Sequence, residues 1–236
     1  MRRTLTGALG WTETGTGLLL GAVEGWGEDE YLAPSGLPGW TRKHLVAHVA
    51  ANADALGNLV RWAATGVRTP MYASAEQRAA DIAAGSRRPA GELAEWLRSS
   101  AERLAARLAG LPDDRWEAKV VTAQGRTVPA TEIPWLRARE VCVHAVDLDA
   151  GIGFADLPAG FLTALADDIA AKRGGAAGPA VALTAGDTGE CWELPGAGEP
   201  AAVTGPLAGV AAYLAGRPHQ LTASDGSPAP ALPAWL

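Results

Sequence analysis

The sequence predicts an α+β protein, with a four-helix bundle followed by a smaller α/β domain. Capped helical patterns dominate residues 1–150, whereas glycine, proline and alanine dominate from about residue 151. Short strand-like runs occur only in that second part. We therefore place the boundary close to residue 152, so that residues 1–152 form the bundle and residues 153–236 the α/β domain.

The first two long helices are expected on either side of a turn rich in proline and glycine. Residues 5–26 form the first helix, although four glycines lower its helix propensity. The turn covers residues 34–39. Thr41 is a favourable N-cap for the second helix, and Gly66 is a typical stop. The apolar stripe of this helix repeats at steps of three and four residues: Leu45, Val49, Leu56, Leu59 and Ala63.

Three further helices complete the predicted bundle. Ser74 opens a capping box for a short helix over residues 74–85. A long helix follows over residues 89–110 and ends at a glycine. After an irregular stretch, Pro134 suits the first turn of a helix over residues 134–149. Four long helices with connecting loops predict an up-and-down bundle.

The second part of the chain has the pattern of a small α/β domain. Strand-like runs occupy residues 180–185, 191–194 and 201–204. Pro206 then opens a helix that ends near Gly216. No segment of the chain repeats at a fixed period.

Composition restricts the class of protein. Hydrophobic residues make up 48% of the chain and charged residues 19%, which favours a folded protein over a disordered one. The formal net charge of −6 argues against a nucleic-acid partner. No run approaches the ~20 apolar residues that span a bilayer, and the N-terminal segment lacks a clear signal-peptide pattern. The two cysteines, 142 and 191, form no C-x-x-C motif. We therefore expect a reduced, cytoplasmic protein with no membrane partner.

The residues best placed for chemistry are two histidines and a glutamate. Glu140 and His144 are four residues apart and share a helix face that should point into the bundle. His48 lies on the inward face of another helix, with Leu45 and Asn52. A buried carboxylate needs a partner, and two imidazoles with one carboxylate are a common catalytic zinc set. A surface ion pair between Glu140 and His144 is the simpler alternative, and His44 with His48 is a rival ligand pair.

Three segments resemble the mycothiol-dependent maleylpyruvate isomerase family. They are LPGWTRKHLVAHVAANADAL at residues 37–56, IPWLRAREVCVHAVDL at residues 133–148, and AAYLAGR at residues 211–217. The resemblance covers essentially the whole chain and is weaker across residues 151–205. It implies a DinB-like bundle followed by an α/β domain, with zinc bound by His48, Glu140 and His144.

The resemblance also implies the cofactors and the reaction. Zinc would convert the thiol of mycothiol to a thiolate at neutral pH, because coordination lowers a thiol pKa. The thiolate would add to the cis double bond of maleylpyruvate, allow rotation, and leave the trans product, fumarylpyruvate. The partners are therefore a small thiol and a small anionic electrophile. No protein cysteine is needed, and Cys142 is interpreted as a packing residue.

The remaining candidate residues have both functional and structural interpretations. The family's functionally implicated arginine corresponds to Arg217, which could bind the cofactor or a carboxylate but also suits a helix end. Asn52 could contact the substrate or the metal-bound water, or only satisfy backbone groups. Asp147 could orient His144 or be an ordinary polar residue near the helix end. Arg137 and Arg139 are weaker carboxylate ligands. A thiol S-transferase and a non-catalytic metal-binding module remain alternatives, as do a monomer and a small homo-oligomer.

Overall fold

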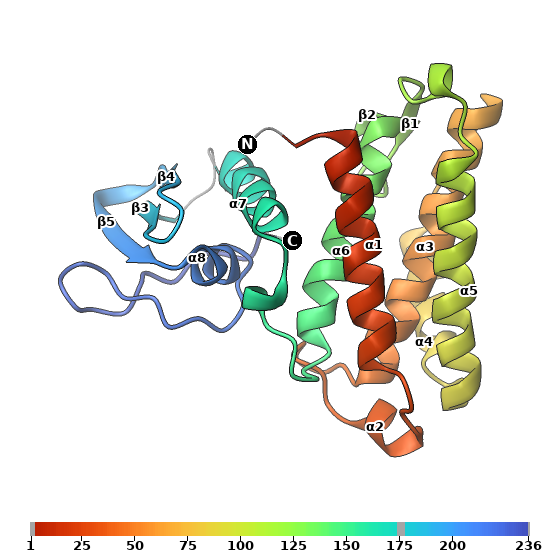
Figure 1. Cartoon of the computed structure of the whole chain (residues 1–236), viewed down its shortest axis with the longest axis horizontal. Coiled ribbons are helices and arrows are strands. Elements are labelled where there is room, and N and C mark those ends of the chain that lie inside the picture. Colours follow the sequence, from red (N-terminus) through yellow and green to blue (C-terminus); the bar gives the residue numbers. More distant parts are fainter. Residues whose placement is uncertain (1–2, 174–177, 236) are drawn as a thin grey trace. The chain divides into compact units, whose positions relative to one another are not determined.

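A computed structural model describes residues 3–173 and 178–235 and divides the chain into two compact units. One is Thr4–Ile152, which is almost entirely helical, and the other begins at Gly153 and contains a three-stranded sheet (Figure 1). The predicted α+β class is confirmed. No helix in the described ranges combines the length and apolar character needed to span a bilayer.

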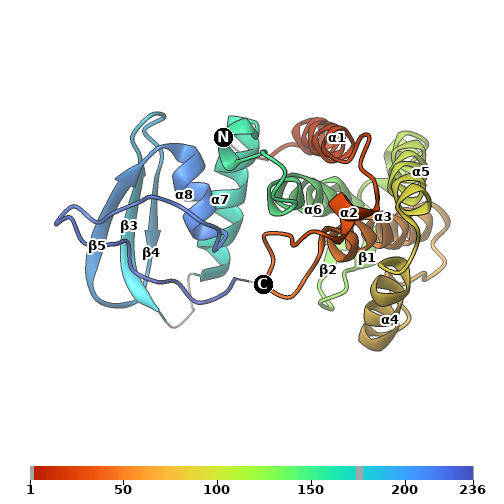
Figure 2. The same cartoon turned by 90° about the horizontal axis from the view of Figure 1, so that it is seen from below.

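Four long helices form the bundle in the first unit (Figure 2): α1 (Leu5–Ala22), α3 (Arg42–Thr65), α5 (Ala90–Ala109) and α6 (Ile133–Asp147). Two shorter helices lie between them in sequence: α2 (Glu28–Leu32) and α4 (Ala75–Gly85). Because α6 packs on both α1 and α3, residues of α3 and α6 meet inside the bundle.

The predicted helix starts and stops are largely confirmed. The Thr41 backbone N–H donates to Nδ1 of His44 over 3.3 Å, and Gly66 ends α3 with a φ of 73°. The Ser74 hydroxyl accepts the backbone N–H of Gln77 at the start of α4. The first helix is shorter than predicted, because Gly25 turns the chain with a φ of 74° before α2 begins.

Helix α1 approaches α6 closely at Gly15. A Cβ atom at this position would lie 2.6 Å from Cγ2 of Val141 and 2.7 Å from Sγ of Cys142. The absence of a side chain therefore permits the contact between the two helices. The glycine that weakens α1 as an isolated helix brings it against the helix that carries Glu140 and His144.

A short hairpin interrupts the stretch predicted to be irregular. Strands β1 (Lys119–Val121) and β2 (Thr127–Pro129) pair in antiparallel register, and Gly125 has a φ of 76° in the connecting turn. Val120 and Val128 are buried against the bundle core. Strands of three residues are too short to produce a recognisable alternation in the sequence.

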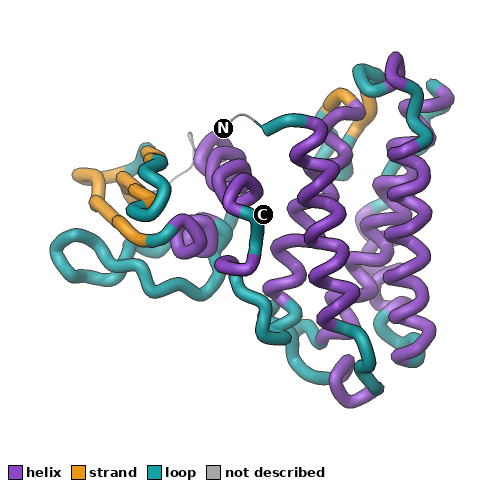
Figure 3. Tube along the Cα trace, in the orientation of Figure 1, coloured by secondary structure: helices purple, strands orange, loops and turns teal. Residues whose placement is uncertain are grey.

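The second unit has a three-stranded sheet with two helices on one face (Figure 2). The strand order is β4-β3-β5, with β3 antiparallel to β4 and parallel to β5. The elements are α7 (Ala159–Arg173), β3 (Pro179–Ala185), β4 (Cys191–Leu194), β5 (Ala197–Gly205) and α8 (Leu207–Leu214). All three predicted strands are present (Figure 3).

Helix α7 was not predicted. Six consecutive residues, 161–166, are buried, so apolar and small side chains face several directions rather than one stripe. A helix buried on several sides lacks the one-sided periodicity by which an amphipathic helix is recognised.

Candidate metal centre

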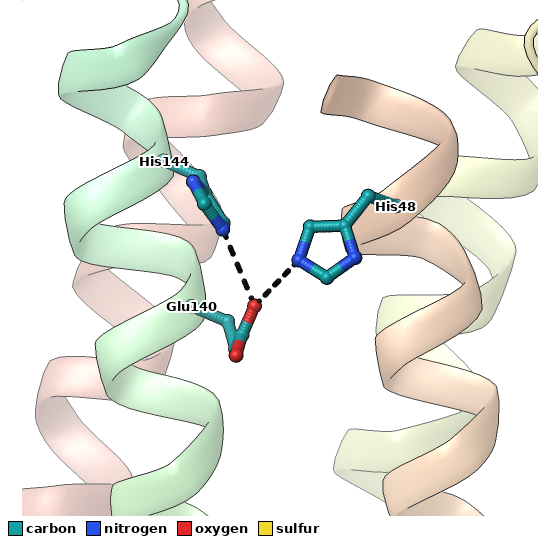
Figure 4. Close-up of side chains that lie close together, drawn as sticks. All are labelled: His48, Glu140 and His144. Atoms are coloured by element: carbon teal, nitrogen blue, oxygen red, sulfur yellow. Dashed lines mark hydrogen bonds and ion pairs between the residues drawn. The ribbon is translucent and has the colours of Figure 1, made fainter. Parts of the chain in front are cut away.

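Three side chains converge between α3 and α6 (Figure 4). Nε2 of His48 lies 2.9 Å from Oε2 of Glu140, and Nε2 of His144 lies 3.3 Å from the same oxygen. The two ligands on α6 are one turn apart, and the packing of α3 against α6 brings His48 to them. The predicted cluster therefore exists as a spatial group.

The donor set fits a zinc ion. One ligand atom from each side chain can be chosen so that all three lie within 4.8 Å of one another. Zinc ligands at 2.0–2.1 Å in tetrahedral geometry are about 3.4 Å apart, so small side-chain adjustments suffice. Two imidazoles and one carboxylate would leave a fourth position open. Among the described residues, no other trio of His, Cys, Asp or Glu side chains comes this close together.

A buried carboxylate orients His144. Oδ2 of Asp147 lies 2.9 Å from Nδ1 of His144, and Asp147 is only 3% exposed. The Asp147 carbonyl oxygen accepts the backbone N–H of Gly36 over 2.7 Å, which fixes this end of α6. With Nδ1–H donating to Asp147, Nε2 of His144 faces Glu140 as a potential ligand atom. The predicted hydrogen bond between Asp147 and His144 is present.

The charges of the cluster are strongly coupled. Burial raises the pKa of Glu140, but hydrogen bonds from His144 and His48 outweigh it and hold the pKa well below its usual value. Burial lowers the pKa of His144, but the bonds to Asp147 and Glu140 raise it to about 9. Burial is the largest influence on His48 and lowers its pKa. Without metal, an ionised Glu140 thus sits between a protonated His144 and a neutral His48, and metal binding must displace a proton.

The cluster opens onto a cavity of about 480 Å³ within the first unit. His48 and Glu140 line it, together with Asn52 and Tyr72. Three arginines from different parts of the chain also line it: Arg68, Arg78 and Arg139. The arrangement offers a metal site beside a cavity that can hold a small anionic molecule.

Comparison with known proteins identifies the family. The family model described as the mycothiol maleylpyruvate isomerase N-terminal domain matches residues 13–149, more than half of the chain. The chain belongs to the mycothiol-dependent maleylpyruvate isomerase family. A comparison with curated proteins gives no match.

Two crystal structures extend this relationship over both units. The structure of the mycothiol-dependent maleylpyruvate isomerase is 39% identical and covers 99% of this chain and 98% of its own, with a TM-score of 0.93. A histidine-to-alanine variant of that isomerase is 38% identical over the same shares of both chains, with a TM-score of 0.92. These similarities identify the present chain as an enzyme of this isomerase family.

In the present chain, the other predicted site residues occupy different environments. Arg217 follows α8 in the second unit, where its Nη1 donates to the Ala215 carbonyl oxygen over 2.8 Å. His44 caps α3 through Thr41 and lies outside the cluster. Arg137 is buried in the bundle and is absent from the cavity wall. Its interpretation as a substrate ligand is therefore not supported.

Asn52 has a fixed side-chain orientation. Its Oδ1 accepts a hydrogen bond from Nη1 of Arg137 over 3.0 Å, and the same Nη1 donates to the Val49 carbonyl oxygen over 2.7 Å. Asn52 also lines the cavity, so its amide nitrogen is the polar group left for a bound molecule. Sequence analysis did not select Tyr72, Arg68 or Arg78. They lie on a loop and a short helix where no recognised motif marks them.

Proposed function

We propose that this enzyme is a zinc- and mycothiol-dependent isomerase that converts maleylpyruvate to fumarylpyruvate by addition and elimination of a thiolate. The observation that carries the proposal is the cluster of His48, Glu140 and His144, two members of which, His48 and Glu140, line a cavity. It is supported by the match of nearly the whole chain to a crystal structure of a mycothiol-dependent maleylpyruvate isomerase. We expect the enzyme to act in the cytoplasm.

The chain's own residues prepare the site before any ligand arrives. Glu140 is held ionised, and Asp147 holds His144 with Nε2 toward Glu140. The low pKa of His48 keeps its imidazole neutral and able to act as a ligand. Zinc held there would supply the acidity that converts a thiol to a thiolate near neutral pH.

The nucleophilic sulfur must come from a small molecule. Burial raises the pKa of Cys142 to about 12, and its Sγ donates to the Trp11 carbonyl oxygen on α1. Such a thiol is neutral and turned away from the cavity. Cys191 is exposed on β4 in the second unit. Neither cysteine is part of the metal cluster or the cavity wall.

Two further residues complete the proposal. Asn52 would donate a hydrogen bond from its amide nitrogen to a substrate oxygen, because Arg137 occupies its carbonyl oxygen. Arg217 would bind the thiol cofactor or a carboxylate through its guanidinium group. These roles predict that Arg217→Ala weakens the use of anionic ligands without removing metal.

An assay of the zinc-loaded protein with maleylpyruvate tests the reaction directly. We expect negligible isomerisation without thiol and saturable isomerisation as mycothiol is added. Turnover that is equally fast without thiol would overturn the mechanism. Accumulation of a thiol conjugate without fumarylpyruvate would instead identify a thiol S-transferase.

A further inference from the structure

The cavity beside the metal cluster has an excess of positive charge. Glu140 is its sole acidic lining residue in the described part of the chain, whereas three arginines contribute to the wall. The arginines come from three places: the loop after α3 for Arg68, helix α4 for Arg78, and α6 for Arg139. A zinc ion held by the cluster would increase the excess further.

Two of these arginines have no counter-ion. Neither Arg68 nor Arg78 forms an ion pair with any carboxylate in the described ranges. Some basic side chains of the same unit are paired, as Arg103 is with Asp54 over 2.8 Å. The positive charge of Arg68 and Arg78 on the cavity wall is therefore not neutralised by an ion pair within the described ranges.

Arg78 is the more informative of the two because it is half-buried beside the cluster. Its Nη2 lies 3.4 Å from Nδ1 of His48, and its Cζ lies 5.8 Å from the centroid of the Tyr72 ring. A partly desolvated cation without a counter-ion is unfavourable, and a bound anion would relieve that penalty. Guanidinium groups bind carboxylates through two parallel hydrogen bonds.

We propose that Arg78 and Arg68 form an anion subsite that holds the carboxylates of a dianionic substrate beside the metal cluster. The identity of this dianion as an electrophile rests on the proposed function, but binding of the anion does not. Specificity for a small dicarboxylate would then be provided by the helical bundle itself. Arg139 adds positive charge to the same wall.

Calorimetric titration with maleate tests the subsite, because maleate is a cis dicarboxylate that does not react without a thiol. The full-length, zinc-loaded protein is titrated in the absence of thiol, alongside Arg78→Gln and Arg68→Gln. We expect each variant to bind maleate about 10-fold more weakly, the usual effect of losing one charge-assisted hydrogen-bonded pair. Dimethyl maleate, which is neutral, should bind weakly to all of them.

Arg87→Gln provides a matched control, because Arg87 is exposed just beyond α4 and is not part of the cavity wall. It should bind maleate as the parent protein does. Zinc content is measured for every variant, since Arg78 lies next to His48. If Arg78→Gln loses zinc, the comparison is made with the metal-free proteins, where maleate binding must still weaken.

The proposal is overturned if both Arg78→Gln and Arg68→Gln bind maleate within twofold of the parent protein. An equal loss in Arg87→Gln would also overturn it, because the effect would then reflect net charge alone. Arginine-dependent maleate binding without thiol-dependent isomerisation would support the subsite and reject the proposed reaction. The anion subsite and the proposed reaction can therefore be rejected independently of each other.

Discussion

Replacing Gly15 with alanine should separate the packing of α1 on α6 from the helix propensity of α1. The added Cβ would lie 2.6 Å from Val141 Cγ2 and 2.9 Å from the backbone nitrogen of Cys142. The backbone atom cannot move without shifting α6. Gly17 is the matched control, because it lies on the same helix, is exposed, and would have no neighbouring atom within 4 Å of an added Cβ.

The expected effects have opposite signs. Glycine to alanine in an exposed helix position adds about 0.5–1 kcal/mol to the free energy of unfolding. The free energy of unfolding of Gly17→Ala should therefore exceed that of the parent protein by this amount. Overpacking at Gly15 costs about 1–3 kcal/mol, so Gly15→Ala should fall below the parent protein by up to about 2 kcal/mol. The two variants should therefore differ by roughly 1–3 kcal/mol.

Urea unfolding followed by helical circular dichroism measures this difference. Because Glu140 and His144 lie on α6, Gly15→Ala should also bind zinc more weakly than Gly17→Ala. Equal stabilisation by the two substitutions would refute the close contact between α1 and α6.

Three further predictions concern the cluster and the two cysteines. Asp147→Asn should weaken zinc binding about 10- to 100-fold in chelator competition, because His144 loses the carboxylate that orients it, while the exposed Asp149→Asn should not. In metal-free protein, the pKa of His144 is raised from 6.5 to about 9. The preferential protonation of His144 in the folded state therefore adds its full amount to the free energy of unfolding below pH 6.5. This contribution is lost as the pH rises to 9. Urea unfolding at these two pH values should show that loss, and His144→Gln should remove it. Cys142→Ala and Cys191→Ser should retain most of the thiol-dependent turnover in the isomerase assay, because neither sulfur lines the cavity.

Much of the bundle could be predicted because its helices carry local signals. Thr41, Gly66 and Pro134 mark helix ends through their own backbone preferences. The spacing of Glu140 and His144 placed them on one face, and the observed contact with His48 agrees with inward-facing positions. These features depend on residues a few positions apart in the sequence.

The features that sequence analysis missed depend on tertiary contacts. Gly15 appeared only as a helix-weakening residue, because its contact with Cys142 joins positions far apart in the chain. Arg78 lies on a short helix whose pattern gives no indication that it reaches His48. Its lack of a carboxylate partner can be recognised only when the whole cavity wall is known.

Zinc content of purified variants tests the central claim most directly. The parent protein and His44→Ala should each contain about one zinc ion per chain, because His44 caps α3 and lies outside the cluster. His48→Ala should lose most of its zinc while circular dichroism shows a folded bundle. Full zinc occupancy in His48→Ala, or loss of zinc in His44→Ala, would contradict the assignment of the metal to His48, Glu140 and His144.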